Sequence, residues 1–259
     1  MKTRVMALSL VLLASTSSFA QDSGQFPDKQ WREVSPQEFN LDQAKIDKLF
    51  DLSFEDSATQ SVVLIKNGVL VSERYAPGYD KHSPGTSWSM AKSFYAALIG
   101  ISIDRGEIDS LDDPVAKYLD YFNDERSAIT LRHLLDMTSG LDFPNHEHEN
   151  MFFTSDHLAY AREVGVEKEA GLVFEYNNVN SMLLADILRE VTEVEADQLL
   201  RERIFNKIGL TDATLWQDSA GNPLTYCCVD ATARQYSRFG LLFARGGNWK
   251  GEQIISQQY

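Results

Sequence analysis

The chain has 259 residues, 43% of them hydrophobic, and its 38 acidic residues outnumber 24 basic ones, which gives a net charge of −14 at pH 7. A charge of this sign repels nucleic acid and anionic membrane surfaces, so we expect neither as a partner. The length allows one large core or two interlocked domains.

The first twenty residues have the pattern of a secretory signal peptide. Lys2 and Arg4 precede an apolar stretch that is too short to span a bilayer, and Ser18-Phe19-Ala20 is a small-x-small cleavage site. We expect residues 1–20 to be removed and residues 21–259 to be periplasmic or secreted, with a net charge of 22 − 38 = −16. No later apolar run approaches the length of a membrane span.

The next elements along the chain are a helix and a hairpin. Asn40 to Leu52 is amphipathic at the helical period, which predicts a helix. Ser61 to Lys66 and Val69 to Tyr75 are β-rich runs separated by Asn67-Gly68, the strongest short signal for a two-residue hairpin turn.

A buried helix is predicted after the hairpin, and it carries the tetrad Ser89-Met90-Ala91-Lys92. Pro84 to Ser87 consists of residues typical of turns and helix N-caps. Met90 to Ile103 is apolar almost all round, and Gly106 is expected to end the helix. A helix that is hydrophobic on every side is buried. The serine is therefore expected in the first turn, with the lysine one turn further along on the same side.

This spacing has a chemical use. A serine hydroxyl is a weak nucleophile until a neighbouring base takes its proton. A lysine can be that base when burial and the helix N-terminus lower its pKa. The alternative is a capping serine beside a lysine that extends to solvent, because about one such tetrad is expected by chance in a chain of this composition.

The region 106–229 is predicted to be mainly helical, and a further helix is predicted from Asp230 to Arg245. The fold class is therefore α+β, an antiparallel sheet flanked by helices with an inserted α-helical region, in one domain over residues 21–259. One confident hairpin is too little sheet to cover the buried helix, because a stable sheet normally needs at least three strands. We therefore expect C-terminal strands to be missing and the domain to be truncated at Tyr259.

Two Tyr-x-Asn triplets could supply a third group that relays a proton, Tyr121-Phe122-Asn123 and Tyr176-Asn177-Asn178. The first follows a packed aromatic segment. The second ends a loop directly before an apolar-striped helix, which is a better position for a catalytic tyrosine. We favour Tyr176 on this placement and expect Tyr121 to be structural.

Other candidates are weaker. His146-Glu147-His148-Glu149 lacks the spacing of a zinc helix, so we expect no metal site and no cofactor. Cys227 and Cys228 are adjacent, and neighbouring Cα atoms lie about 3.8 Å apart, below the usual disulfide range of about 4.4–6.8 Å. Two buried free thiols are the expected state.

Several ordered motifs together resemble the serine β-lactamase and penicillin-binding-protein superfamily. The resemblance is to its class C-like branch, near 6-aminohexanoate-dimer hydrolases. It rests on Val62–Tyr75, Ser87–Tyr118, Leu134–Asp142, Phe174–Val191 and Cys227–Gly247. It implies a β-lactamase-like fold, Ser89 as the acylated nucleophile, Lys92 as its base, Tyr176 as proton relay and Asn178 as a substrate-binding residue. The family's third motif, on a late strand that supplies an oxyanion-hole N–H, would lie beyond Tyr259.

The expected function is a serine hydrolase that cleaves an amide, ester or lactam through an acyl-enzyme on Ser89. The substrate would be a small molecule or a peptide. The 259 residues alone would lack one oxyanion donor, whose loss typically costs about 10²–10³ in rate. The alternative is a non-catalytic, penicillin-binding-like protein that binds a cell-wall ligand in the same cleft.

Overall fold

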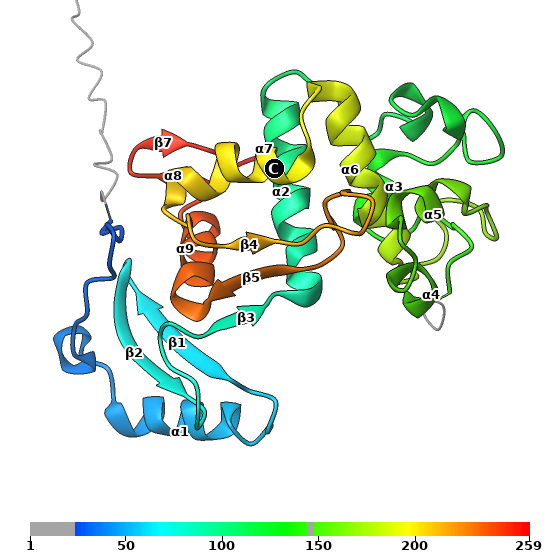
Figure 1. The fold of residues 1–259 in the computed structure, drawn as a ribbon. Helices are drawn as coiled ribbons and strands as arrows, with labels where there is room; N and C mark the ends of the chain where they lie inside the picture. Colours follow the sequence, from blue (N-terminus) through cyan, green and yellow to red (C-terminus); the bar gives the residue numbers. More distant parts are fainter. Residues whose placement is uncertain (1–23, 145–147) are drawn as a thin grey trace, which may run out of the picture.

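The computed structural model describes residues 24–144 and 148–259, so the predicted signal peptide lies outside the described residues. The described helices and strands are arranged around α2, the helix at the centre of Figure 1, and short turns connect them. The helices are α1 (Gln43–Ser53), α2 (Ala91–Asp104), α3 (Leu131–Leu135), α4 (His148–Phe152), α5 (His157–Glu163), α6 (Asn178–Thr192), α7 (Ala196–Leu200), α8 (Asn206–Ile208) and α9 (Ala233–Ala244). The strands are β1 (Ser61–Lys66), β2 (Val69–Tyr75), β3 (Pro84–Thr86), β4 (Thr214–Leu215), β5 (Val229–Thr232), β6 (Asn248–Trp249) and β7 (Glu252–Gln253). Short 3₁₀ turns lie at η1 (Pro36–Phe39), η2 (Trp88–Met90), η3 (Val115–Lys117) and η4 (Asp120–Phe122), and a π-helical turn, Arg201–Phe205, joins α7 to α8.

The predicted hairpin is confirmed with the predicted bounds. β1 and β2 pair antiparallel from Ser61 opposite Tyr75 to Lys66 opposite Val69. The turn residues Asn67 and Gly68 have φ of 53° and 79°, and two successive positive φ values are what this turn requires. In Figure 1 α1 lies below the β1–β2 hairpin. Ile46 and Phe50 of α1 form a buried cluster with Val69 and Val71 of β2.

Two further sheets are small. β3, β5 and β4 form a three-stranded antiparallel sheet, and β6 pairs with β7. Within residues 24–144 and 148–259 no sheet has more than three strands. The fold class is thus α+β, helices with small antiparallel sheets, as the sequence predicts.

The prediction that a helix begins at Asp230 is wrong. Asp230 lies in β5, where its carboxylate accepts hydrogen bonds from Thr86 Oγ1 at 2.6 Å and Trp216 Nε1 at 2.8 Å. The helix α9 begins three residues later. Thr232 caps it and forms a reciprocal pair with Gln235, the Thr-x-x-Gln version of a capping box.

The central helix α2 is buried as predicted. Phe94, Leu98 and Ile99 are each 0% exposed. The Phe94 ring packs edge-on against Phe205 and Phe239, so the π-helical turn and α9 both contact this helix. Among the described residues, no helix has the length and apolar character needed to cross a bilayer.

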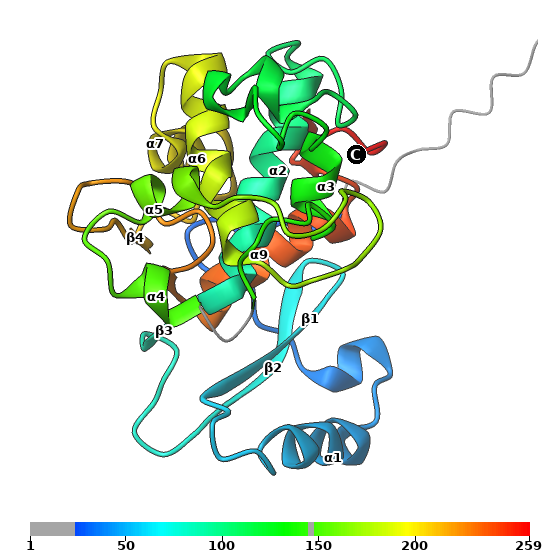
Figure 2. The ribbon, with the colours of Figure 1, turned by 90° about the vertical axis from the view of Figure 1, so that its right-hand side faces the viewer.

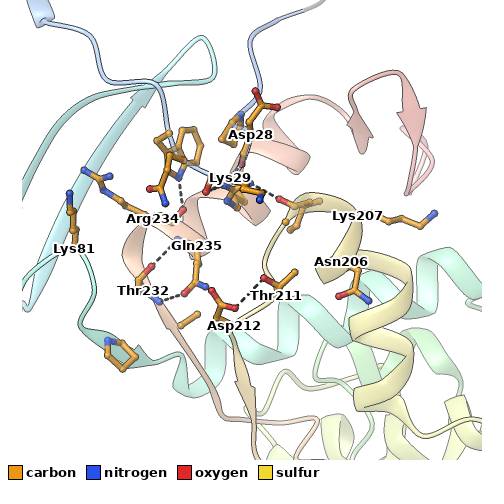
Figure 3. Close-up of a pocket in the computed structure, with 18 of the residues that line it drawn as sticks. Asp28, Lys29, Lys81, Asn206, Lys207, Thr211, Asp212, Thr232, Arg234 and Gln235 are labelled. Carbon is orange, nitrogen blue, oxygen red and sulfur yellow. Dashed lines mark hydrogen bonds between the residues drawn. The ribbon is translucent and has the colours of Figure 1, made fainter.

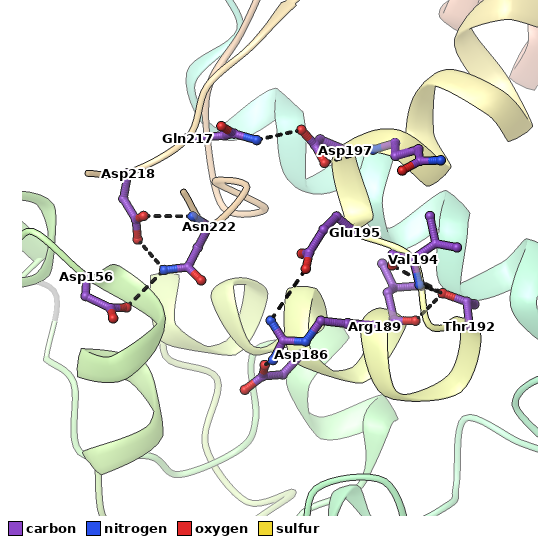
Figure 4. A network of polar contacts seen from close by, with 12 residues as sticks. Asp156, Asp186, Arg189, Thr192, Val194, Glu195, Asp197, Gln217, Asp218 and Asn222 are labelled. Atoms are coloured by element: carbon purple, nitrogen blue, oxygen red, sulfur yellow. Dashed lines mark hydrogen bonds and ion pairs between the residues drawn. The ribbon is translucent and has the colours of Figure 1, made fainter. Parts of the chain in front are cut away.

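The helices α3 to α6 form a separate lobe against α2 in Figures 1 and 2. A loop from β4 back to β5 is attached to this lobe by polar contacts, part of which Figure 4 shows. Asp218 accepts from His157 N at 2.8 Å and from Asn222 Nδ2 at 2.9 Å. Further along, Thr225 Oγ1 donates to the carbonyl of Ser181 in α6 at 2.6 Å. This loop therefore reaches β5 in a fixed position.

The burial of α2 gives a stability prediction. Leu98→Ala should lower the free energy of unfolding by about 2–5 kcal/mol, because the packed surroundings would leave a cavity. Leu49→Ala removes the same atoms from a side chain that is 48% exposed and should cost within about 0.5 kcal/mol. Urea denaturation of the two variants measures this difference, and equal losses would contradict a packed core around α2.

Candidate active site

The Ser89 turn is attached to the sheet by its neighbour Ser87. The backbone N–H of Ser87 donates to Val229 O at 2.7 Å, and Ser87 Oγ accepts from Val229 N at 2.9 Å. Ser89 then lies in η2, directly before α2, rather than in the first α-helical turn as predicted. Trp88 between them has φ of 44°, a conformation that non-glycine residues seldom adopt, and such strain gathers at functional sites.

The side chain of Lys92 connects three segments of the chain. Its Nζ lies 3.2 Å from Ser89 Oγ, 2.8 Å from Asn178 Oδ1 and 2.7 Å from the carbonyl oxygen of Tyr226. The aromatic rings of Tyr176 and Tyr226 lie 4.9 and 5.7 Å from Nζ. The amine is thus enclosed by polar acceptors and two rings.

Burial lowers the pKa of Lys92 to about 7, because the enclosed amine loses the water that would solvate its ammonium form. No described carboxylate forms an ion pair with Lys92 that would restore the charge. At neutral pH a large share of the side chain is therefore the free amine.

Tyr176 completes the arrangement at Ser89. Its hydroxyl donates to Ser89 Oγ at 2.5 Å. The loop before it is fixed by backbone bonds from Gly171 N to Thr138 O at 2.8 Å and from Glu175 N to Met137 O at 2.9 Å. The structure thus brings the three predicted residues Ser89, Lys92 and Tyr176 into one hydrogen-bonded chain.

Tyr121 lies elsewhere. Its hydroxyl donates to Asp186 Oδ2 at 2.7 Å, and Arg162 forms a bidentate pair with the same carboxylate at 2.7 Å for each bond. Burial and the Asp186 charge raise the pKa of Tyr121 well above its usual range. This tyrosine belongs to a buried polar cluster, in agreement with the structural role that its position predicted.

Asn178, predicted as a substrate-binding residue, is the first residue of α6 and accepts from Lys92. Sequence analysis missed Tyr226, whose backbone carbonyl contacts the same amine. Its hydroxyl also lies 3.0 Å from His157 Nδ1, and burial raises the pKa of this phenol. No motif could have revealed the contact, because a backbone carbonyl is common to every residue type.

The expected free thiols are a wrong prediction. Cys227 and Cys228 form a disulfide, with their Cα atoms 3.4 Å apart. The usual Cα range describes bridges between separate segments, whereas here the turn before β5 directs both sulfurs to the same side of the chain. Both residues are buried, at 4% and 1% exposure, so each sulfur has the other as its neighbour.

A large cavity lies away from these residues. It has a volume of about 970 Å³ and lies between the segment Pro27–Trp31, β5, α8 and α9, as Figure 3 shows. His82 is one of the residues that line it. Some of its charged groups are paired, for example Lys250 with Asp28 at 2.7 Å and Arg234 with Glu73. Lys29 and Lys81 also line the cavity.

No group of three metal-binding side chains occurs within the part of the chain that the structure describes. The histidine-rich stretch considered above lies partly outside the described residues, because residues 145–147 are not described. His133 caps its own helix, where its Nδ1 accepts from Thr130 N at 3.2 Å.

Comparison with known proteins agrees with this fold. The family model described as Beta-lactamase matches residues 53–257. This model describes the class of serine hydrolases of the β-lactamase and penicillin-binding type. The chain belongs to the Beta-lactamase family.

Two curated relatives show the range of the family. The chain is 23% identical over 222 residues to a 6-aminohexanoate-dimer hydrolase of Paenarthrobacter ureafaciens, a match that covers 78% of this chain and 56% of that protein. It is 32% identical over 140 residues to a D-aminopeptidase of Brucella anthropi, covering 51% of this chain and 26% of that protein. The chain thus spans about half or less of the length of these relatives.

The fold is also that of a solved class C beta-lactamase mutant. The two superpose with a TM-score of 0.60 at 18% identity, over 83% of this chain and 70% of that one.

The enclosure of Lys92 predicts a titration that can be observed directly. In the protein labelled with ¹³C at the lysine Cε, the Lys92 signal should titrate near pH 7, because burial disfavours the ammonium form. Lys117 is the internal control, since its contacts with Asp109 and Asp113 raise its pKa. Lys92→Arg identifies the signal by its loss, and a Lys92 midpoint near 10 would contradict the burial.

Proposed function

We propose that the protein is a serine hydrolase that cleaves an amide, ester or lactam through an acyl-enzyme on Ser89. The observation that carries the proposal is the hydrogen-bonded chain from Tyr176 through Ser89 to Lys92, with oxygen–oxygen and oxygen–nitrogen distances of 2.5 and 3.2 Å. A nucleophile in contact with a base whose pKa is near neutrality is the arrangement that acyl transfer requires.

The proposed first step transfers the acyl group to the enzyme. Ser89 Oγ attacks the carbonyl carbon of the substrate as its proton moves to Lys92 Nζ. The bond to the leaving amine or alcohol breaks, and the proton reaches the leaving group through Tyr176. Water then attacks the acyl carbon, gives one proton to the Lys92–Tyr176 pair, and releases the acid while Ser89 regains its hydrogen.

Exposed apolar side chains near the nucleophile favour a substrate with an apolar portion. Trp88 and Met90, on either side of Ser89, are 62% and 42% exposed, and Phe174, two residues before Tyr176, is 68% exposed. The names of the two relatives, a dimer hydrolase and an aminopeptidase, add support for an amide bond as the one cleaved.

Covalent labelling tests the nucleophile. A fluorophosphonate or penicillin-type probe should label the whole protein on the peptide that contains Ser89, because Ser89 contacts Lys92, whose pKa burial lowers to about 7. Peptide mass mapping locates the adduct, and Ser89→Ala is the control. Labelling of another serine, or equal labelling of the Ser89→Ala variant, would contradict the proposal.

The two tyrosines provide a matched pair. Tyr176→Phe should lower the rate of probe or ester turnover by about 10²–10⁴, because the leaving group loses its proton donor. Tyr121→Phe removes the same atom from the Asp186 cluster and should leave the rate near that of the wild type while lowering stability. Initial rates and thermal unfolding are measured for both variants. A large loss of rate in Tyr121→Phe but not in Tyr176→Phe would assign the catalytic role to Tyr121.

A further inference from the structure

The disulfide between Cys227 and Cys228 lies between two contacts that hold the Ser89 site. On its N-terminal side, the carbonyl of Tyr226 accepts from Lys92 Nζ at 2.7 Å. On its C-terminal side, Val229 exchanges two hydrogen bonds with Ser87, through its carbonyl at 2.7 Å and its N–H at 2.9 Å. Cys227 directly follows Tyr226 and Cys228 directly precedes Val229, so the bridge lies between these two contacts.

A bridge between neighbours adds little to the stability of a fold as a whole. The entropy that a cross-link removes from the unfolded chain grows with the length of the loop it closes, and adjacent residues close the shortest loop available. Its effect must be local. It restricts the backbone rotations of Cys227 and Cys228, and so it fixes the direction of the Tyr226 carbonyl relative to Val229.

The rest of this loop is already attached on both sides. Thr225 Oγ1 donates to Ser181 O at 2.6 Å, and Cys228 O accepts from Trp216 N at 3.1 Å. The cysteines are buried at 4% and 1% exposure, so the bridge is shielded from reductants in solution. It has the properties of a permanent constraint.

The direction of the Tyr226 carbonyl matters because a neutral amine has two N–H bonds and one lone pair. Asn178 Oδ1 at 2.8 Å and Tyr226 O at 2.7 Å accept the two N–H bonds. The lone pair is then left to face Ser89 Oγ at 3.2 Å, where it can take the proton. Without the carbonyl, the amine is free to rotate and water can enter beside it.

We propose that the Cys227–Cys228 disulfide is a positioning element of this site, which holds the Tyr226 carbonyl on Lys92 and so directs the lysine lone pair at Ser89. The inference rests on the proposed acylation of Ser89. The titratable groups that face Lys92 Nζ are the phenols of Tyr176 and Tyr226, and no described carboxylate pairs with it.

The test measures the rate of Ser89 labelling by a fluorophosphonate against pH, in the wild type and in the Cys227→Ser/Cys228→Ser variant. Opening the bridge should admit water to Lys92 and move the pH midpoint of labelling upward by about one unit. This corresponds to a fall of about tenfold in rate below the midpoint. Intact mass after alkylation of the denatured wild type, with and without a phosphine reductant, verifies the bridge.

Ser102→Ala is the matched control. Ser102 is a buried serine in the same helix α2 as Lys92, bonded to Arg203 Nη1 at 3.2 Å and remote from Ser89. It should lower stability without moving the pH midpoint. If the double variant does not fold, the single variant Cys228→Ser, which also lacks the bridge and keeps Cys227, replaces it in the same measurement.

Two results would overturn the inference: an unchanged midpoint and rate after the bridge is opened, or a midpoint that moves downward. These differ from a failure of the proposed function. In that case the wild type with an intact bridge would not be labelled on Ser89 at any pH.

Discussion

The amine of Lys92 is the point on which the arrangement of this molecule depends. It meets η2 through Ser89, the start of α6 through Asn178 and the turn before β5 through Tyr226, three segments that are far apart in the sequence. Enclosing a cation without a counter-charge is costly, and the protein limits the cost by lowering the pKa of the group instead of pairing it. A stable core around α2 has to be in place for this enclosure to exist.

The surrounding fold supplies that core in two parts. α1 and the β1–β2 hairpin form one small hydrophobic cluster, and α2 with the helical lobe and α9 forms the larger one. The strand β3 of the three-stranded sheet ends at Thr86, one residue before Ser87, which β5 holds through Val229, so the register of this sheet sets the position of the nucleophile turn. Small sheets thus act here as positioning elements as well as core.

The surroundings of Tyr121 and Tyr176 differ in how their charged groups are paired. Asp186 is 1% exposed, and its charge is balanced by Arg162 and Arg189 and shared with Tyr121, a fully paired cluster that contributes to the helical lobe. Among the residues that the structure describes, Lys92 and Tyr176 have no ionic partner, and Tyr176 remains 37% exposed. The two Tyr-x-Asn tyrosines therefore differ in their surroundings. The hydroxyl of Tyr121 is bonded within an ionic cluster, whereas the hydroxyl of Tyr176 is bonded to Ser89.

The sequence by itself determined the hairpin, the buried helix α2 and the proximity of Ser89 to Lys92. Each depends on residues close together in the chain: Asn67-Gly68 permits two positive φ values, and a spacing of three places serine and lysine on one side of a turn. Placement in a loop before a helix was also enough to prefer Tyr176 over Tyr121. Tertiary structure decided the rest. Asp230 became a strand residue because Thr86 and Trp216 bond its carboxylate, and the cysteines joined because one turn holds both sulfurs together. The Tyr226 carbonyl reaches Lys92 only through long-range packing, and a backbone carbonyl leaves no trace in a sequence.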